Sequence, residues 1–237
     1  MKDFSISDAI MTYIVFLYST VAHEAAHAWT AWRLGDDTAY QGGQVSLDPT
    51  PHIKREPIGM VAVPLISLFV GGWLIGWASA PYDPTWERRY PKRSALMAMA
   101  GPATNVLLLV LAAIAIRVGM AAGGFVQPPL SSIGWSQITT PVADGGMWAF
   151  AATLCSIVFS MNLLLATFNL LPFPPLDGRA IPLFFLRGAA VDTYLNFVRH
   201  PTFGMVGLLL SWQLFGPIYR PLRLMAIHLL YPAIGAY

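Results

Sequence analysis

Long apolar stretches separated by short polar ones dominate the pattern of residues along this chain. The apolar blocks cover residues 9–31, 58–80, 94–118, 147–171, 203–219 and 222–236. Most of them approach the length of about 20 residues that a helix needs to cross about 30 Å of hydrocarbon. The pattern therefore predicts an α-helical integral membrane protein with about five or six transmembrane or re-entrant segments.

The second apolar block contains residues that interrupt helices. Pro64 and the pair Gly71-Gly72 lie inside it, and a proline-rich loop follows. Proline and glycine both weaken a helix interior, so residues 58–80 either span the membrane or enter it and return. The basic residues favour return, because that path places residues 33–56 and 81–93, which carry half of the 14 Lys and Arg residues, on the same side.

The polar segment between the first two blocks has a different periodicity. Polar and apolar side chains alternate from Gln44 to Asp48, with Gly42-Gly43 before them and Pro49 after them. Alternation with a period of two between turn residues is typical of a β-strand. We therefore expect a short membrane-associated β-hairpin at this position.

The composition agrees with a membrane protein. Of the 237 residues, 56% are hydrophobic and 11% are charged, against roughly 25% charged residues in a soluble domain. The net charge of +2 is too small to indicate a nucleic-acid partner. No repeat or change of composition divides the chain, so we expect one membrane domain over residues 1–237, with a catalytic core at about 9–180 and C-terminal helices at about 203–236.

The first apolar block carries the strongest chemical signal, His23-Glu24-Ala25-Ala26-His27. Residues four apart share a helix face, so the two imidazoles can bind one zinc ion while Glu24 lies beside its open position. Ionisable side chains in a membrane segment cost roughly 2.5–3.5 kcal/mol each, and a divalent cation compensates that cost. The alternative interpretation is a pair of partly buried histidines on a packed helix.

A catalytic zinc usually takes three protein ligands, so the histidine pair needs a partner from elsewhere in the chain. Asp177 is the best candidate, because it follows three prolines at the broken end of an apolar block. Irregular backbone at membrane depth is tolerated only inside protein or beside a water-filled cavity. The alternative is that Asp177 only caps the helix that follows it.

These motifs resemble those of the site-2 proteases, intramembrane zinc metalloproteases that pair His-Glu-x-x-His with a later Asn-x-x-Pro-x-Pro-x-Leu-Asp-Gly segment. The second motif is complete here from Asn169 to Gly178, and residues 101–105 resemble the middle-helix motif of the family. The resemblance implies that His23, His27 and Asp177 bind one Zn²⁺ per chain. It further implies that Glu24 is the catalytic base and that Asn169 contacts the substrate or the oxyanion.

The resemblance implies an enzyme that cleaves single-span membrane proteins within or near their transmembrane helices, in regulated proteolysis. Its partners would be that substrate and the lipid bilayer of a bacterial or archaeal cell membrane, with the active site facing the cytosol. The alternative is a membrane metal carrier or channel that uses the same ligands. A carrier needs no general base, and its ionisable residues would be distributed along a path instead of lying at one depth.

Overall fold

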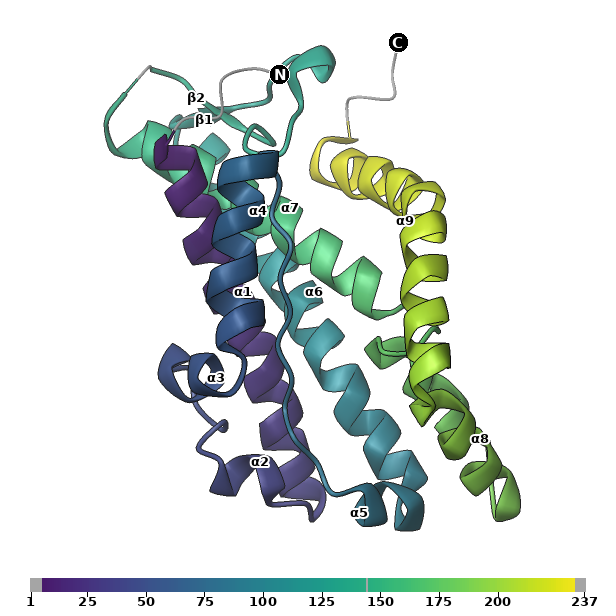
Figure 1. The fold of residues 1–237 in the computed structure, drawn as a ribbon. Helices are drawn as coiled ribbons and strands as arrows, with labels where there is room; N and C mark the ends of the chain where they lie inside the picture. Colours follow the sequence, from purple (N-terminus) through teal and green to yellow (C-terminus); the bar gives the residue numbers. More distant parts are fainter. Residues whose placement is uncertain (1–5, 144, 233–237) are drawn as a thin grey trace.

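The computed structural model describes residues 6–143 and 145–232, most of which are helical (Figure 1). Three of the described helices are long and apolar enough to cross a membrane, namely α1 (Ile6–Leu34), α6 (Pro91–Ala121) and α7 (Gly146–Asn169). They correspond to the first, third and fourth apolar blocks. The fold therefore agrees with the predicted helical membrane protein, whereas the total of five or six membrane segments stays a prediction.

Further elements connect and flank these three helices. The helices are α2 (Thr38–Gln41), α3 (Pro49–Arg55), α4 (Val63–Gly71), α5 (Pro84–Arg89), α8 (Ala189–Arg199) and α9 (Pro201–Leu230). A π-helical turn η1 (Ile58–Ala62) precedes α4, and 3-10 turns form η2 (Leu130–Ser132) and η3 (Asp177–Phe184). In the described residues, the two apolar blocks predicted after residue 203 are joined in α9, which is bent (Figure 1). This helix contains Pro217 and Pro221, and proline inside a helix is a known cause of such bends.

The second apolar block forms a helix and then an extended segment that runs back alongside it. The helix α4 ends at Gly72, whose φ of 68° lies in the left-handed region that glycine adopts without strain. The chain then returns in extended form, and the amides of Ile75 and Trp77 donate hydrogen bonds to the Ser67 hydroxyl and the Gly59 carbonyl at 3.0 Å each. Both ends of this segment therefore lie in the half of the molecule that carries α2, α3 and α5 (Figure 1).

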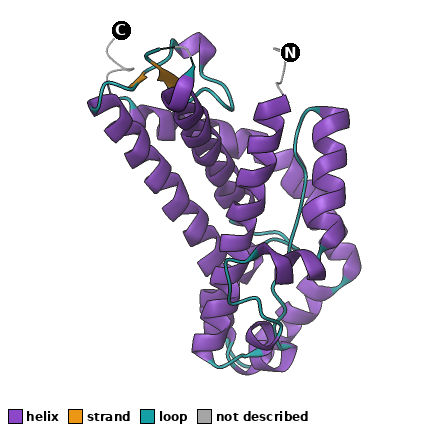
Figure 2. Cartoon of the chain, turned by 90° about the vertical axis from the view of Figure 1, so that its left-hand side faces the viewer, coloured by secondary structure: helices purple, strands orange, loops and turns teal. Residues whose placement is uncertain are grey.

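The β-hairpin predicted at Gln44–Asp48 is wrong in position. These residues form bends, because local side chains satisfy their backbone: the amides of Asp48 and Thr50 donate to the Ser46 hydroxyl and the Asp48 carboxylate at 3.0 and 2.8 Å. Asp48 thereby caps α3. The small sheet instead pairs β1 (Phe125–Val126) with β2 (Thr140–Pro141), antiparallel, at the opposite end of the molecule from α2 and α5 (Figure 2).

The helices α1, α6 and α7 pack against one another, and η3 packs against α6. One apolar cluster contains Phe16 of α1 together with Ile157 and Met161 of α7. Residues Ala95 and Ala98 of α6 form another cluster with the buried side chains of η3 and α8. The core therefore holds α1, α6 and η3, the three elements that carry the candidate site, in fixed positions.

Candidate metal centre

The helix α1 brings the two histidines of the first motif onto one buried face. His23 and His27 are one turn apart, and their rings meet edge to face with centroids 4.6 Å apart. Their Nε2 atoms lie 2.9 Å from each other. His23, Glu24 and His27 are all about 5% exposed, so the face that carries them is turned into the protein.

Asp177 lies 154 residues after His23 in the sequence but contacts both histidines in space. The helix α7 ends at Asn169, the segment 170–176 is irregular and contains a cis peptide bond between Pro174 and Pro175, and η3 begins at Asp177. One carboxylate oxygen of Asp177 lies 3.0 Å from Nε2 of His23 and 3.3 Å from Nε2 of His27. The carboxylate does not cap η3, because its N-cap residue is Leu176 and no side-chain cap is formed. The capping alternative is therefore not supported.

Hydrogen bonds to the outer nitrogens set the tautomers of both histidines. Nδ1 of His27 lies 2.8 Å from the carbonyl oxygen of Met97. Because a carbonyl only accepts, this Nδ1 carries a proton, so in the neutral imidazole Nε2 is the nitrogen with a free lone pair. Nδ1 of His23 lies 2.6 Å from Oδ1 of Asn105 in the same way.

The orientation of the Asn105 amide is fixed by a chain of hydrogen bonds that ends on the backbone. Nδ2 of Asn162 donates to the carbonyl of Val158 at 2.9 Å and to the Ser19 hydroxyl at 3.0 Å. Oδ1 of Asn162 therefore accepts from Nδ2 of Asn105 at 2.9 Å, which leaves Oδ1 of Asn105 facing His23. Asn105 and Asn162 are fully buried, so water does not compete for these bonds.

Three atoms that can each supply an electron pair to a metal thus converge at one point. The Nε2 atoms of both histidines and the carboxylate of Asp177 all face one another within 4.8 Å. Two imidazole lone pairs beside a carboxylate repel one another unless a cation lies between them. Two nitrogens and one oxygen at these separations are compatible with zinc, which binds imidazole and carboxylate at about 2.0–2.2 Å. Outer hydrogen bonds of the kind made to Met97 and Asn105 are typical of metal-binding histidines.

Gly101 of α6 allows the helices to approach at this point. A Cβ atom built at residue 101 would overlap Nε2 of both His23 and His27. Any larger residue would displace the two imidazoles. The Gly-Pro-x-x-Asn sequence at 101–105 therefore contributes twice to the site, through the missing side chain of Gly101 and through the amide of Asn105.

Glu24 lines a cavity of about 150 Å³ next to the three donors. No hydrogen bond or ion pair within the described part of the chain engages its carboxylate. The walls come from α1, the extended return at residues 78–80, the first turns of α6, and η3. The polar residues that line it are Glu24, His27, Ser79, Tyr82, Glu87, Ser94, Asp177 and Arg179.

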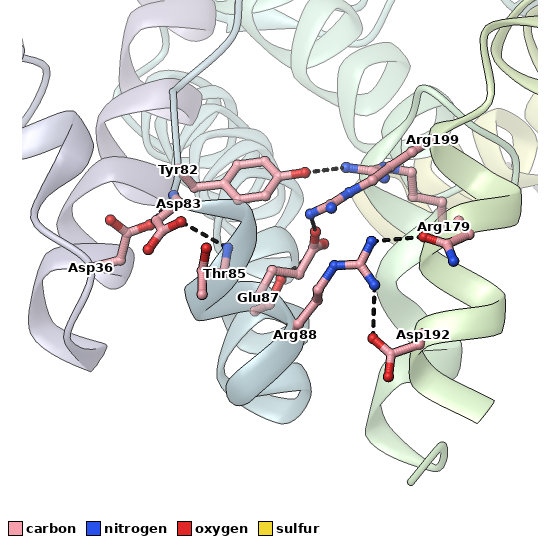
Figure 3. A network of polar contacts seen from close by, with 11 residues as sticks. Asp36, Tyr82, Asp83, Thr85, Glu87, Arg88, Arg179, Asp192 and Arg199 are labelled. Carbon is pink, nitrogen blue, oxygen red and sulfur yellow. Dashed lines mark hydrogen bonds and ion pairs between the residues drawn. The ribbon is translucent and has the colours of Figure 1, made fainter. Parts of the chain in front are cut away.

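A network of polar contacts holds the Asp177 segment against α5 and α6 (Figure 3). Arg199 forms an ion pair with Glu87, which is 2% exposed. The Arg179 guanidinium donates to the Tyr82 hydroxyl at 3.0 Å, and the Arg179 carbonyl accepts a hydrogen bond from Tyr194. These contacts cross from the α5 region to η3 and α8. They therefore fix the element on which Asp177 lies.

The structure brings together four of the five predicted site residues but not the fifth. Asn169 is the last residue of α7, is half-buried, and does not line the Glu24 cavity. Conversely, the sequence argument missed Asn162 and Ser19. A polar side chain in an apolar membrane helix costs free energy unless it has a polar partner. The presence of Asn162 and Ser19 in such helices was therefore the signal that could have identified them. Nε2 of His52 lies 3.0 Å from the Ser46 carbonyl oxygen, so this histidine makes a structural hydrogen bond.

Comparison with known proteins identifies relatives over most of the chain. The profile of Peptidase family M50 matches residues 11–208. The chain is 32% identical over 176 residues to "Putative zinc metalloprotease YwhC" of Bacillus subtilis, a match that covers 73% of this chain and 68% of that protein. It is 31% identical over 172 residues to "Putative zinc metalloprotease Rip2" of Mycobacterium tuberculosis, covering 72% of this chain and 55% of that protein.

No solved structure matches the chain significantly. The profile match extends from α1 to α9 and includes His23, His27, Asn105 and Asp177. It thus covers each element that carries the converging donors. The chain belongs to Peptidase family M50, the site-2 protease family of zinc metalloproteases.

Proposed function

We propose that this intramembrane zinc metalloprotease holds one zinc ion per chain through His23, His27 and Asp177. The observation that carries the proposal is the convergence of two imidazole nitrogens and one carboxylate oxygen beside Glu24, which lines the same cavity as His27 and Asp177. Within the described residues, these three form the one group of three or more His, Cys, Asp or Glu side chains placed to hold a metal. A single group at one depth favours an enzyme over a carrier, which would need several such groups along a path.

The proposed reaction is hydrolysis of a peptide bond with Glu24 as general base. Zinc, when bound, would lower the pKa of a water toward about 7 and polarise the substrate carbonyl. Glu24 lines the cavity and has no competing partner among the described residues, so its carboxylate would accept the proton of the attacking water. The same carboxyl group would then deliver that proton to the leaving amine.

The proposed substrates are single-span membrane proteins, cut within or near their transmembrane helices in regulated proteolysis. A helical substrate must unwind before its carbonyl can react. Residues 78–80, which line the cavity in extended form, support binding of an unwound segment beside Glu24. The predicted edge strand at Gln44–Asp48 is absent, so it has no part in this proposal.

Asn169 is proposed as a contact to the substrate or the oxyanion, and Asp177 as the metal ligand. Zinc prefers carboxylate to a neutral amide, whereas an amide can donate a hydrogen bond to a developing negative charge. We expect Asp177→Ala to lose bound zinc and activity, and Asn169→Ala to keep zinc and lose about 10²–10³ in rate. Metal analysis of both purified variants tests the assignment. Zinc retained by Asp177→Ala and lost by Asn169→Ala would reverse it.

The active site is proposed to face the cytosol. The basic residues of α3, α5 and the start of α6 gather at one end of the molecule, and the positive-inside rule places that end in the cytosol. Single cysteines at Lys54 and Arg89, in a Cys155→Ser background, should both react with an impermeant thiol reagent only after the membrane is opened. Labelling of the two positions from opposite sides would contradict the re-entrant path.

The direct test of the enzyme is cleavage of a panel of single-span proteins by the purified chain in lipid, with and without a chelator. We expect cleavage that stops on zinc removal and returns on zinc addition. Cleavage that persists in full after zinc has been removed to background would contradict the proposal. The carrier alternative instead predicts chelator-sensitive zinc transport into sealed vesicles without proteolysis.

A further inference from the structure

A second cavity lies outside the candidate metal centre, between the start of α6 and the start of α8. Its volume is about 560 Å³, and its walls are residues 88–93, 186–188, 191 and 192. None of these residues lines the Glu24 cavity. The cavity lies at the end of the molecule that carries α5 (Figure 1). At this end, the basic first residues of α6 are followed by the apolar residues of the same helix.

The walls of this cavity carry a large excess of positive charge. The one carboxylate, Asp192, is 2.7 Å from Arg88, which also donates to Asn196 at 2.7 Å (Figure 3). Four further cations line the cavity, and none of them forms an ion pair with a carboxylate of the described residues. These four are Arg89, Lys92, Arg93 and Arg187.

Local contacts hold two of these side chains in place. The guanidinium groups of Arg93 and Arg89 lie 4.5 and 5.5 Å from the ring centroid of Tyr90. Arg93 also donates to the Leu34 carbonyl at 3.0 Å. Like charges gathered without a counter-charge repel one another, and binding of an anion removes that repulsion. The positive ends of α6 and α8 add to the same potential.

The surface next to the cavity indicates which anion it binds. Leu96 lies one turn after Lys92 on α6 and is 50% exposed. The same face continues through Leu107 and Ile114, which are 56% and 53% exposed. An exposed apolar stripe along a membrane-spanning helix therefore begins one turn beyond the lining residue Lys92. A free phosphate uses only the charges, whereas a phospholipid uses both the charges and the stripe.

We propose that this cavity binds the phosphate headgroup of an anionic phospholipid, with its acyl chains along the Leu96–Ile114 face of α6. Basic pockets at the ends of membrane helices bind such headgroups. Residues 186–188 lie two to four residues after the end of η3, on which Asp177 lies. A headgroup bound between them and the start of α6 therefore ties η3 to the helix that carries Met97 and Gly101.

The test compares three forms of the full chain in detergent: wild type, Lys92→Gln/Arg187→Gln, and the control Lys54→Gln/Arg33→Gln. Both double variants lose two positive charges, but only the first pair lines the cavity. Melting temperature is followed while dioctanoyl phosphatidylglycerol, dioctanoyl phosphatidylcholine or inorganic phosphate is added. A ligand that binds only the folded protein raises the melting temperature.

We expect phosphatidylglycerol, and not phosphatidylcholine, to stabilise the wild type and the control variant. The cavity variant should need on the order of tenfold to thirtyfold more phosphatidylglycerol for the same shift, since it loses two basic contacts. Zinc content and gel-filtration elution establish that the cavity variant is folded. If it is not folded, the single variant Arg187→Gln, in the loop before α8, is measured instead, with a proportionately smaller effect.

Three outcomes would overturn the proposal. An unchanged phosphatidylglycerol requirement in the cavity variant would show that the lipid binds elsewhere. An equal effect of phosphatidylcholine would remove the role of the anionic charge. Stabilisation by inorganic phosphate at the same concentration as phosphatidylglycerol would identify a site for a soluble anion instead of a lipid. Because the readout is stability, these outcomes do not depend on whether the chain cleaves the proposed substrates.

Discussion

Replacing Asn162 by leucine tests whether the buried amide chain sets the state of His23. Asn162 lies in α7 and contacts no candidate metal ligand, yet its Oδ1 accepts the 2.9 Å hydrogen bond that orients Asn105. Leucine has a similar volume but no acceptor. In the variant, Nδ2 of Asn105 loses its partner, and nothing then selects the amide orientation that presents Oδ1 to His23.

The expected effect is a loss of zinc affinity. Removing an outer hydrogen-bond partner of a metal ligand typically costs about 10–100-fold in metal affinity, or about 1.4–2.8 kcal/mol. The buried amide left unsatisfied costs a further 1–3 kcal/mol or so of folding free energy. The variant should therefore fold less stably and bind zinc at least about tenfold more weakly than the wild type.

The assay is competition for zinc between the purified protein and a chromogenic chelator. Ser160→Ala is the matched control, because Ser160 also lies in α7 and donates a hydrogen bond to a backbone carbonyl, that of Trp135, at 2.8 Å. This control should lose stability but keep its zinc affinity. Zinc affinity in Asn162→Leu within twofold of the control, in a folded protein, would refute the proposed relay.

Two further predictions follow from the same geometry. Gly101→Ala should lose zinc and activity, because its Cβ would overlap both imidazoles. The control Gly204→Ala, whose Cβ would meet no atom within 4 Å, should keep zinc and activity. Equal zinc content in the two variants would contradict the close approach of α6 to the histidines. Glu87→Gln should lower the free energy of unfolding by about 3–5 kcal/mol, since it leaves Arg199 without its buried partner. Asp192→Asn, which breaks an exposed ion pair, should cost at most about 1 kcal/mol, and similar losses in denaturant titrations of both variants would refute the argument.

The parts of the site that depend on local periodicity could be predicted from the sequence. The spacing of His23 and His27 requires only a helix to bring both rings to one face, and α1 provides it. Asp177 was identified because three prolines must break the helix before it, and the structure places its carboxylate against both histidines. Both inferences use constraints that neighbouring residues impose on one another.

The parts that failed depend on competition between local and long-range hydrogen bonds. The alternation at Gln44–Asp48 is compatible with a strand, but Ser46 and Asp48 satisfy the backbone locally and start α3 instead. The contact between Asn162 and Ser19 joins residues 143 positions apart. Periodicity within α1 or α7 carries no information about such a pairing, so a polar residue in an apolar helix could be noted but its partner could not be named.

The central claim is that Glu24 acts as a base beside a zinc ion that other residues hold. Glu24→Gln keeps the size and burial of the side chain but removes its capacity to accept a proton. The measurement is zinc per chain together with cleavage of a single-span protein that the wild type cuts. We predict near one zinc per chain and no cleavage. Sustained cleavage by the Gln variant would contradict the role of Glu24 as the base. Loss of zinc from this variant would indicate that Glu24 is a metal ligand, which would also contradict the assignment.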